Sequence, residues 1–203
     1  MKSSSLSAAL SILIAVATSF AFQEPGKPAE AGARKNDPSW DPMREFARPG
    51  PAHKVLESRV GNWTTLLRMW NEPGSPPSFD AGTAEIKWIL GGRYLEISYD
   101  GTILREPFQG VGHTGFDNLK QEYVSTWIDN AGTGINHSEG TFDAATQSIT
   151  YTGECPDTNE WKYVKCRTVE KQIDADHWAQ QMYTAGPDGS EFLCVDITFT
   201  RAK

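Results

Sequence analysis

The stretch Val60-Gly61-Asn62-Trp63-Thr64-Thr65 decides the fold of this chain. The residues before it, 52–60, end at the glycine and place Leu56 and Val60 one helical turn apart, which predicts a short helix. The residues after it change to an alternating hydrophobic pattern, which predicts a strand. A Gly-x-Trp at such a helix-to-strand junction is typical of closed β-barrels in which the helix covers one mouth.

Alternating segments continue from this junction to the end of the chain, and turn residues such as Gly91-Gly92 separate them. The predicted strands lie near residues 62–71, 81–90, 93–100, 102–116, 121–129, 135–142, 147–155, 162–173, 177–184 and 190–200. An antiparallel meander of this length normally closes on itself, because closure removes the unpaired edges. The expected fold is all-β, a closed antiparallel meander barrel of about ten strands with a short N-terminal helix.

Arg201 ends the last predicted strand. In a closed barrel that strand pairs with the first one, so the guanidinium of Arg201 can cover the indole of Trp63 and close the barrel end. A cation–π contact of this kind contributes about 0.5 to 2 kcal/mol. Gly61, Trp63 and Arg201 are therefore predicted to be structural residues.

The N-terminal segment predicts export. Residues 1–21 combine a basic start, a short apolar run and small residues before a cut after Ala21, which is the pattern of a signal peptide. The apolar run is shorter than the roughly 20 residues of a membrane-spanning helix. The mature chain is expected to be periplasmic or secreted, with no membrane span. It begins with a Pro-rich tether at 22–51, and one barrel domain follows at 52–203.

Composition and motifs restrict the function. The formal net charge of −7, without a basic stripe, argues against nucleic acid and anionic membrane surfaces as partners. The sequence has no Gly-x-Ser-x-Gly elbow, no His-Glu-x-x-His, no Cys-x-x-Cys and no phosphate-binding loop, and its four histidines show no ligand spacing. No catalytic residue, metal site or cofactor is predicted, and the oligomeric state stays open.

Across a short turn, the side-chain directions of one strand predict those of the next, because opposite residues in a hairpin point to the same side of the sheet. The alternation of the last strand turns Leu193, Val195, Ile197 and Phe199 toward the core. Carried back through two turns, the rule places Gln180, Glu170 and Tyr151 inside the barrel. A buried carboxylate needs hydrogen-bonding side chains, water or a ligand, so these three residues form the central candidate site.

The same rule, applied to the other strands, gives a map of inward and outward residues. This facing map extends the site and predicts a function. It turns Trp88, Tyr99, His113, Trp178 and Met182 inward, and it leaves on the outside Trp127, His137, Glu139, His177 and Cys194. A barrel of this size has room for one small ligand, so we expect a small apolar or amphipathic molecule in the interior.

Two alternatives remain open. One is a haem-type or enzymatic barrel that uses His113 as its inward histidine. The other is an envelope protein of structural or partner-binding function, with a filled core and with Trp127 and Trp161 outside.

The three cysteines allow at most one internal bridge. Cys155 and Cys166 oppose one another if the loop between their strands is centred near residues 160 and 161. Export favours a disulfide between them, with Cys194 left as a free thiol. Three reduced cysteines are the alternative.

Six runs carry a resemblance to a known family: Trp88-Ile89-Leu90-Gly91-Gly92-Arg93-Tyr94-Leu95, Pro107-Phe108-Gln109-Gly110, Gly115-Phe116-Asp117-Asn118, Tyr123-Val124-Ser125-Thr126-Trp127-Ile128-Asp129-Asn130, Ser138-Glu139-Gly140-Thr141-Phe142-Asp143 and Gly186-Pro187-Asp188-Gly189. Together they resemble the bacterial domain-of-unknown-function family 1579 over residues 53–201. The resemblance implies a calycin-like, lipocalin-resembling barrel that is often exported and has no established activity. It assigns no catalytic residue, and a disulfide would be particular to this chain.

Overall fold

The computed structural model describes residues 39–158, 160–186 and 188–203. The predicted signal peptide at 1–21 and the tether residues 22–38 lie outside the described residues. Among those described, no helix has the length and hydrophobicity needed to cross a membrane.

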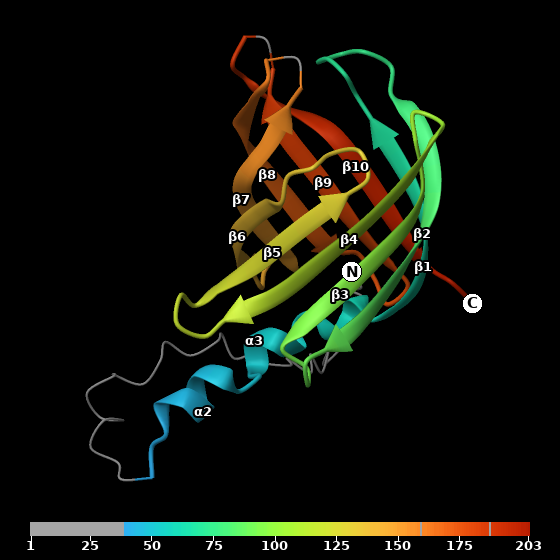
Figure 1. The fold of residues 1–203 in the computed structure, drawn as a ribbon. Coiled ribbons are helices and arrows are strands. Elements are labelled where there is room, and N and C mark those ends of the chain that lie inside the picture. The colour runs from blue at the N-terminus through green and yellow to red at the C-terminus, as the bar shows by residue number, and fades with distance from the viewer. Residues whose placement is uncertain (1–38, 159, 187) are drawn as a thin grey trace, which may run out of the picture.

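Ten antiparallel strands form a closed barrel in which each strand pairs with its sequence neighbours and the last pairs with the first (Figure 1). The strands are β1 (Gly61–Met69), β2 (Ser78–Ile89), β3 (Tyr94–Ile103), β4 (Glu106–Asp117), β5 (Glu122–Asp129), β6 (Asn136–Asp143), β7 (Ser148–Asp157), β8 (Lys162–Gln172), β9 (His177–Ala185) and β10 (Glu191–Arg201). The predicted meander is confirmed, and most strand bounds agree with the prediction to within three residues.

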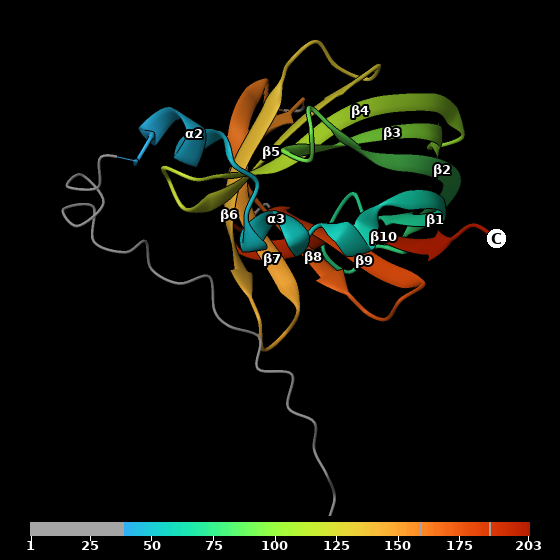
Figure 2. The ribbon, with the colours of Figure 1, turned by 90° about the horizontal axis from the view of Figure 1, so that it is seen from below.

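The helix predicted at 52–60 is present as two pieces, α3 (Pro51–Lys54) and the 3₁₀ helix η1 (Glu57–Arg59), which cover one end of the barrel (Figure 2). The Tyr123 hydroxyl on β5 donates a 2.9 Å hydrogen bond to the carbonyl of Ala52 and so fixes α3 in place. A further helix, α2 (Pro42–Ala47), lies within the predicted tether. The Asn118 amide binds the carbonyls of Phe46 and Arg48, so the end of the tether is attached to the turn after β4.

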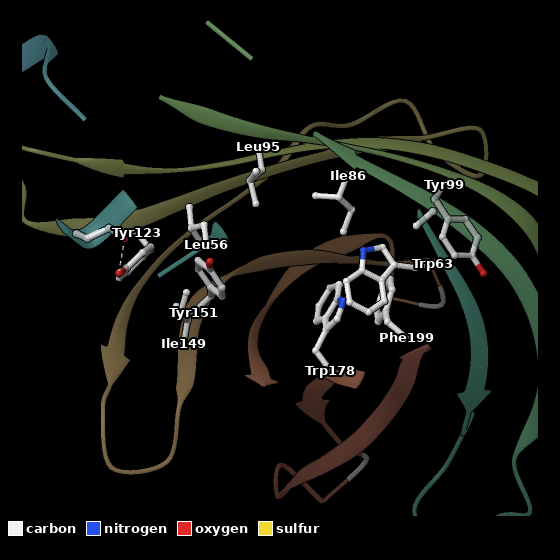
Figure 3. Packing of buried hydrophobic residues seen from close by; sticks show 12 residues of the cluster. Leu56, Trp63, Ile86, Leu95, Tyr99, Tyr123, Ile149, Tyr151, Trp178 and Phe199 are labelled. Atoms are coloured by element: carbon white, nitrogen blue, oxygen red, sulfur yellow. Dashed lines mark hydrogen bonds between the residues drawn. The ribbon is translucent and has the colours of Figure 1, made fainter. Parts of the chain in front are cut away.

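The half of the barrel under α3 and η1 is filled with buried side chains (Figure 3). Trp178 stacks on Phe199 with ring centroids 3.7 Å apart, and Trp63 meets Trp178 edge to face at 6.3 Å. Other buried apolar residues complete this core: Leu56, Ile86, Leu95, Tyr123 and Ile149. The core therefore occupies the capped end and leaves the opposite end of the interior less filled.

The predicted closure of the barrel is confirmed. Trp63 pairs with Arg201 across the β1–β10 seam, and the guanidinium carbon lies 4.2 Å from the centre of the indole. Arg201 also donates 2.9 Å hydrogen bonds to the carbonyls of Ser58 and Val60, which attaches the cap to the last strand. Gly61 has φ of 137°, and a Cβ there would lie 2.6 Å from a guanidinium nitrogen, so a larger residue would strain the backbone and displace Arg201 from its position.

The facing map is wrong in β4 and β5. The six-residue loop 130–135 does not fix the register as a tight turn does, and one residue of slip inverts every side chain before it. The structure turns Trp127 inward, flat against Gly110 and Gly112, and leaves Ile128 about half exposed. The inversion also moves His113 to the outer face, where it lies 3.6 Å from Glu96.

The turn between β3 and β4 is also displaced from its predicted position. The predicted strands 93–100 and 102–116 put the turn at Asp100-Gly101, but this pair lies inside β3. The chain reverses at Leu104 and Arg105, whose φ values are 52° and 68°. The carboxylate of Asp80 accepts hydrogen bonds from both of their backbone N–H groups and from the Thr102 hydroxyl. This network stabilises a turn that contains no glycine, so turn composition could not reveal it.

Replacing Arg201 by Ala should lower the free energy of unfolding by about 1 to 3 kcal/mol, because the cation–π contact and the bonds to the cap are lost together. Urea unfolding measures the change. The matched control is Arg167→Ala, since Arg167 lies 3.9 Å from the centre of the Tyr183 ring on the outer wall and closes no seam. Equal losses in the two variants would contradict the closing role.

Candidate functional site

A cavity of about 310 Å³ lies inside the barrel and extends from the packed core toward the end opposite the cap. Its wall is mainly apolar and is formed by side chains that include Leu67, Ile97, Phe108, Trp127, Ile197 and Phe199. Polar residues gather at its deep end, close to the core: Tyr151, Glu170 and Gln180. Ligand sites in proteins commonly combine an apolar wall with a few placed polar groups.

Glu170 is the centre of the polar group, as predicted. Its side chain is about 4% exposed and forms an ion pair with Arg59, whose side chain is about 7% exposed. Gln180 faces Glu170 from β9, and its amide donates a 3.4 Å hydrogen bond to the second carboxylate oxygen. The carboxylate is therefore satisfied by protein groups on both oxygens.

Arg59 joins the cap to the deep end of the cavity. Burial alone would lower the pKa of Arg59, but Glu170 and Tyr151 beside it outweigh burial and raise the pKa, so the guanidinium stays charged. The same guanidinium lies 5.3 Å from the centre of the Trp178 ring. Burial raises the pKa of Tyr151 well above its ordinary value, so its hydroxyl stays protonated at neutral pH.

Five of the seven predicted ligand contacts line the cavity, namely Tyr99, Tyr151, Glu170, Trp178 and Gln180. Trp88 does not, because its indole N–H donates a 2.7 Å hydrogen bond to Glu57 at the capped end. His113 does not either, since it lies on the outer face.

Two important residues were missed by the sequence reasoning. Arg59 lies three residues after Leu56, so both side chains share the inner face of the cap, and this spacing was the available signal. For Trp127 the signal was the pair Gly110 and Gly112, because alternate glycines on one face of a strand leave a flat surface against which an aromatic ring can pack.

The thiols of Cys155 and Cys166 both line the open end of the cavity and contact each other. Their shared hydrogen bond raises the pKa of Cys155 and lowers that of Cys166. The two residues are diagonal neighbours rather than opposite, because Cys155 pairs with Val164 and Cys166 with Gly153. All three cysteines are free thiols in the structure.

A bulge displaces Cys194 from the regular alternation of β10. Its thiol donates to the carbonyl of Met182 at 3.3 Å, and burial raises its pKa to about 11. The bulge also places Leu193 opposite Tyr183, on the outer wall rather than in the core. The described residues contain no cluster of three or more His, Cys, Asp or Glu side chains arranged to hold a metal ion.

Residues 48–201 match the sequence profile of a family described as protein of unknown function, DUF1579. The chain belongs to this family. A sequence comparison with curated proteins finds no match.

A solved structure supports the fold of this DUF1579 chain. The crystal structure of Rv2717c from M. tuberculosis is similar with a TM-score of 0.57 and 13% identity, covering 77% of this chain and 100% of that one. A de novo designed fluorescence-activating β-barrel is more distant, with a TM-score of 0.41 and 15% identity over 73% of this chain and 97% of that one. At these identities the likeness concerns the fold alone.

Replacing Glu170 by Gln should destabilise the protein by about 3 to 5 kcal/mol, because it leaves the charge of Arg59 buried without its partner. Adding Arg59→Met to that variant should recover much of the loss. The outer-face control is Glu139→Gln, whose solvent-exposed pair with Lys120 should contribute far less to stability. Urea unfolding of the four proteins gives the comparison, and a Glu170→Gln loss no larger than the control's would refute the structural role of the pair.

A bridge between Cys155 and Cys166 should form under oxidising conditions and add about 2 to 3 kcal/mol or less, since the loop is short and the diagonal placement adds strain. Alkylation without reductant, followed by intact mass measurement, should then find one labelled thiol in the parent and none in Cys194→Ser. Three labels on the oxidised parent would exclude the bridge.

Proposed function

We propose that this protein binds one small apolar or amphipathic molecule in the barrel interior, and that it does so after export to the periplasm or beyond. The observation that carries the binding proposal is the cavity of about 310 Å³. Its volume lies at the lower end of the range of about 300 to 1,000 Å³ that holds small ligands in proteins. Export rests on the signal-like residues 1–21.

Two features make the cavity suitable for such a molecule. The capped end is closed by packed side chains, so a ligand enters from the opposite end and reaches a defined floor. The wall supplies aromatic rings, with Phe108 and Trp127 stacked at 6.5 Å and 20° between ring planes. Apolar contact with these rings drives binding, and the polar floor orients one end of the ligand.

The two alternatives receive less support. A haem-type site needs a histidine directed into the cavity. His137 borders the cavity, but like His113 it lies on the outer side of its strand, whereas His177 contacts Asp174 and His53 packs on Phe116 at the cap. A filled core does not agree with a cavity of this volume. Trp161, 88% exposed at the tip of the β7–β8 hairpin, keeps a partner-binding surface as a second candidate function.

The binding proposal can be tested with N-phenyl-1-naphthylamine, a small neutral probe that fluoresces in apolar surroundings. We expect saturable binding to the parent protein, and at least a tenfold weaker affinity for Thr168→Phe, which fills the middle of the cavity. Lys165→Phe is the matched control, because it adds the same ring to an exposed position of the same strand. Equal affinity in both variants, each shown by its melting curve to be folded, would refute binding in the interior.

A further inference from the structure

Two buried hydrogen-bond donors at the deep end of the cavity have no acceptor. The hydroxyl of Tyr151 and the indole N–H of Trp178 make no hydrogen bond of standard geometry with any described group. Both residues line the cavity and are about 1% exposed, and both project from the barrel wall toward its centre (Figure 3). Buried polar groups are nearly always paired, so two unpaired donors in one cavity need an explanation.

The neighbouring side chains do not satisfy these donors. Arg59 lies beside both of them, but a guanidinium has N–H groups only and accepts no hydrogen bond. The carboxylate of Glu170 accepts from Arg59 on one oxygen and from the Gln180 amide on the other, and it forms no hydrogen bond with either unpaired donor. What the deep end lacks is therefore an acceptor, not a donor.

The charge balance at the same place excludes an ionic partner. Arg59 and Glu170 neutralise each other, and Asp129, the charged residue on the wall of β5, accepts instead from the Trp127 indole toward the open end. A carboxylate or ammonium group brought to the deep end would be a buried charge without a counter-charge, which costs several kcal/mol. A neutral acceptor avoids this cost.

We propose that the ligand is a neutral, mainly apolar molecule whose deep end carries a hydrogen-bond-accepting oxygen, as in a ketone, aldehyde, ester or amide. Its oxygen accepts from the Tyr151 hydroxyl, and its apolar body lies against the aromatic wall. This inference rests on the proposed function, because it specifies the chemistry of a ligand in the same cavity.

A matched set of ligands tests the inference by calorimetric titration. The set consists of 2-acetylnaphthalene, 2-isopropenylnaphthalene, which replaces the carbonyl oxygen by a CH₂ group, and 2-naphthoate, which is anionic. The ketone should bind about 2- to 12-fold more tightly than the alkene, the factor expected for one neutral hydrogen bond. The naphthoate should bind more weakly than the ketone by tenfold or more.

Tyr151→Phe provides the matched variant, because it removes the hydroxyl and keeps the ring. Removing an unpaired O–H should leave the melting temperature of the ligand-free protein unchanged or raised, and should reduce the preference for ketone over alkene. The control is Tyr163→Phe, which removes an exposed hydroxyl at the rim and should keep the preference.

The outcomes separate the two proposals. If ketone and alkene bind equally, if the naphthoate binds as tightly as the ketone, or if Tyr151→Phe keeps the full preference, the inference is overturned while binding in the cavity stands. The inference also fails if the ketone does not bind where N-phenyl-1-naphthylamine does. If neither the naphthalenes nor that probe binds, the proposed function itself is refuted.

Discussion

The rest of the structure depends on the contact of Arg201 with Trp63. The guanidinium covers the indole at the seam where the last strand meets the first, and its N–H groups bind the carbonyls of Ser58 and Val60. One side chain therefore closes the sheet and attaches the cap. Gly61 is required at this point because the guanidinium occupies the space where a Cβ would lie. Residues 60–65 therefore determine the fold through the packing of Arg201 on Trp63.

Closure of the seam also determines the deep end of the cavity. When the cap is held by Arg201, the residue between its two anchored carbonyls, Arg59, is directed into the barrel and meets Glu170. The indole of Trp63 adds a 2.8 Å hydrogen bond to the carbonyl of Arg59. A buried ion pair seldom adds much stability, but removal of either partner is costly, so it specifies one position of the cap. A residue outside the barrel strands thus pairs with Glu170 on the polar floor of the cavity.

Sequence reasoning succeeded at the tight turns before β9 and β10, and it failed at the long loop 130–135 and at the glycine-free turn between β3 and β4. From Phe199 back through the turns before β10 and β9, the opposite pairs were predicted correctly, and Glu170 was placed beside Gln180 as observed. The six-residue loop 130–135 leaves the register free, which explains the inversion that misplaced His113 and Trp127. The ion-pair partner of Glu170 could not be found from facing rules, because these rules relate strands to strands and Arg59 lies in the cap.

The hollow part of the barrel follows from the size of its inward residues. At the capped end the inward positions carry large side chains, among them Trp63, Trp178 and Phe199, and they fill the space. Farther along the sheet, the inward positions of β4 to β8 carry small ones, including Gly112, Ser125, Ser138, Gly153 and Thr168. Tryptophan therefore acts in two ways here: Trp63 and Trp178 fill one end, whereas Trp127, seated on glycines, lines the other. Close packing is the usual state of a protein interior, so a row of small residues on neighbouring strands accounts for the open space in this part of the barrel.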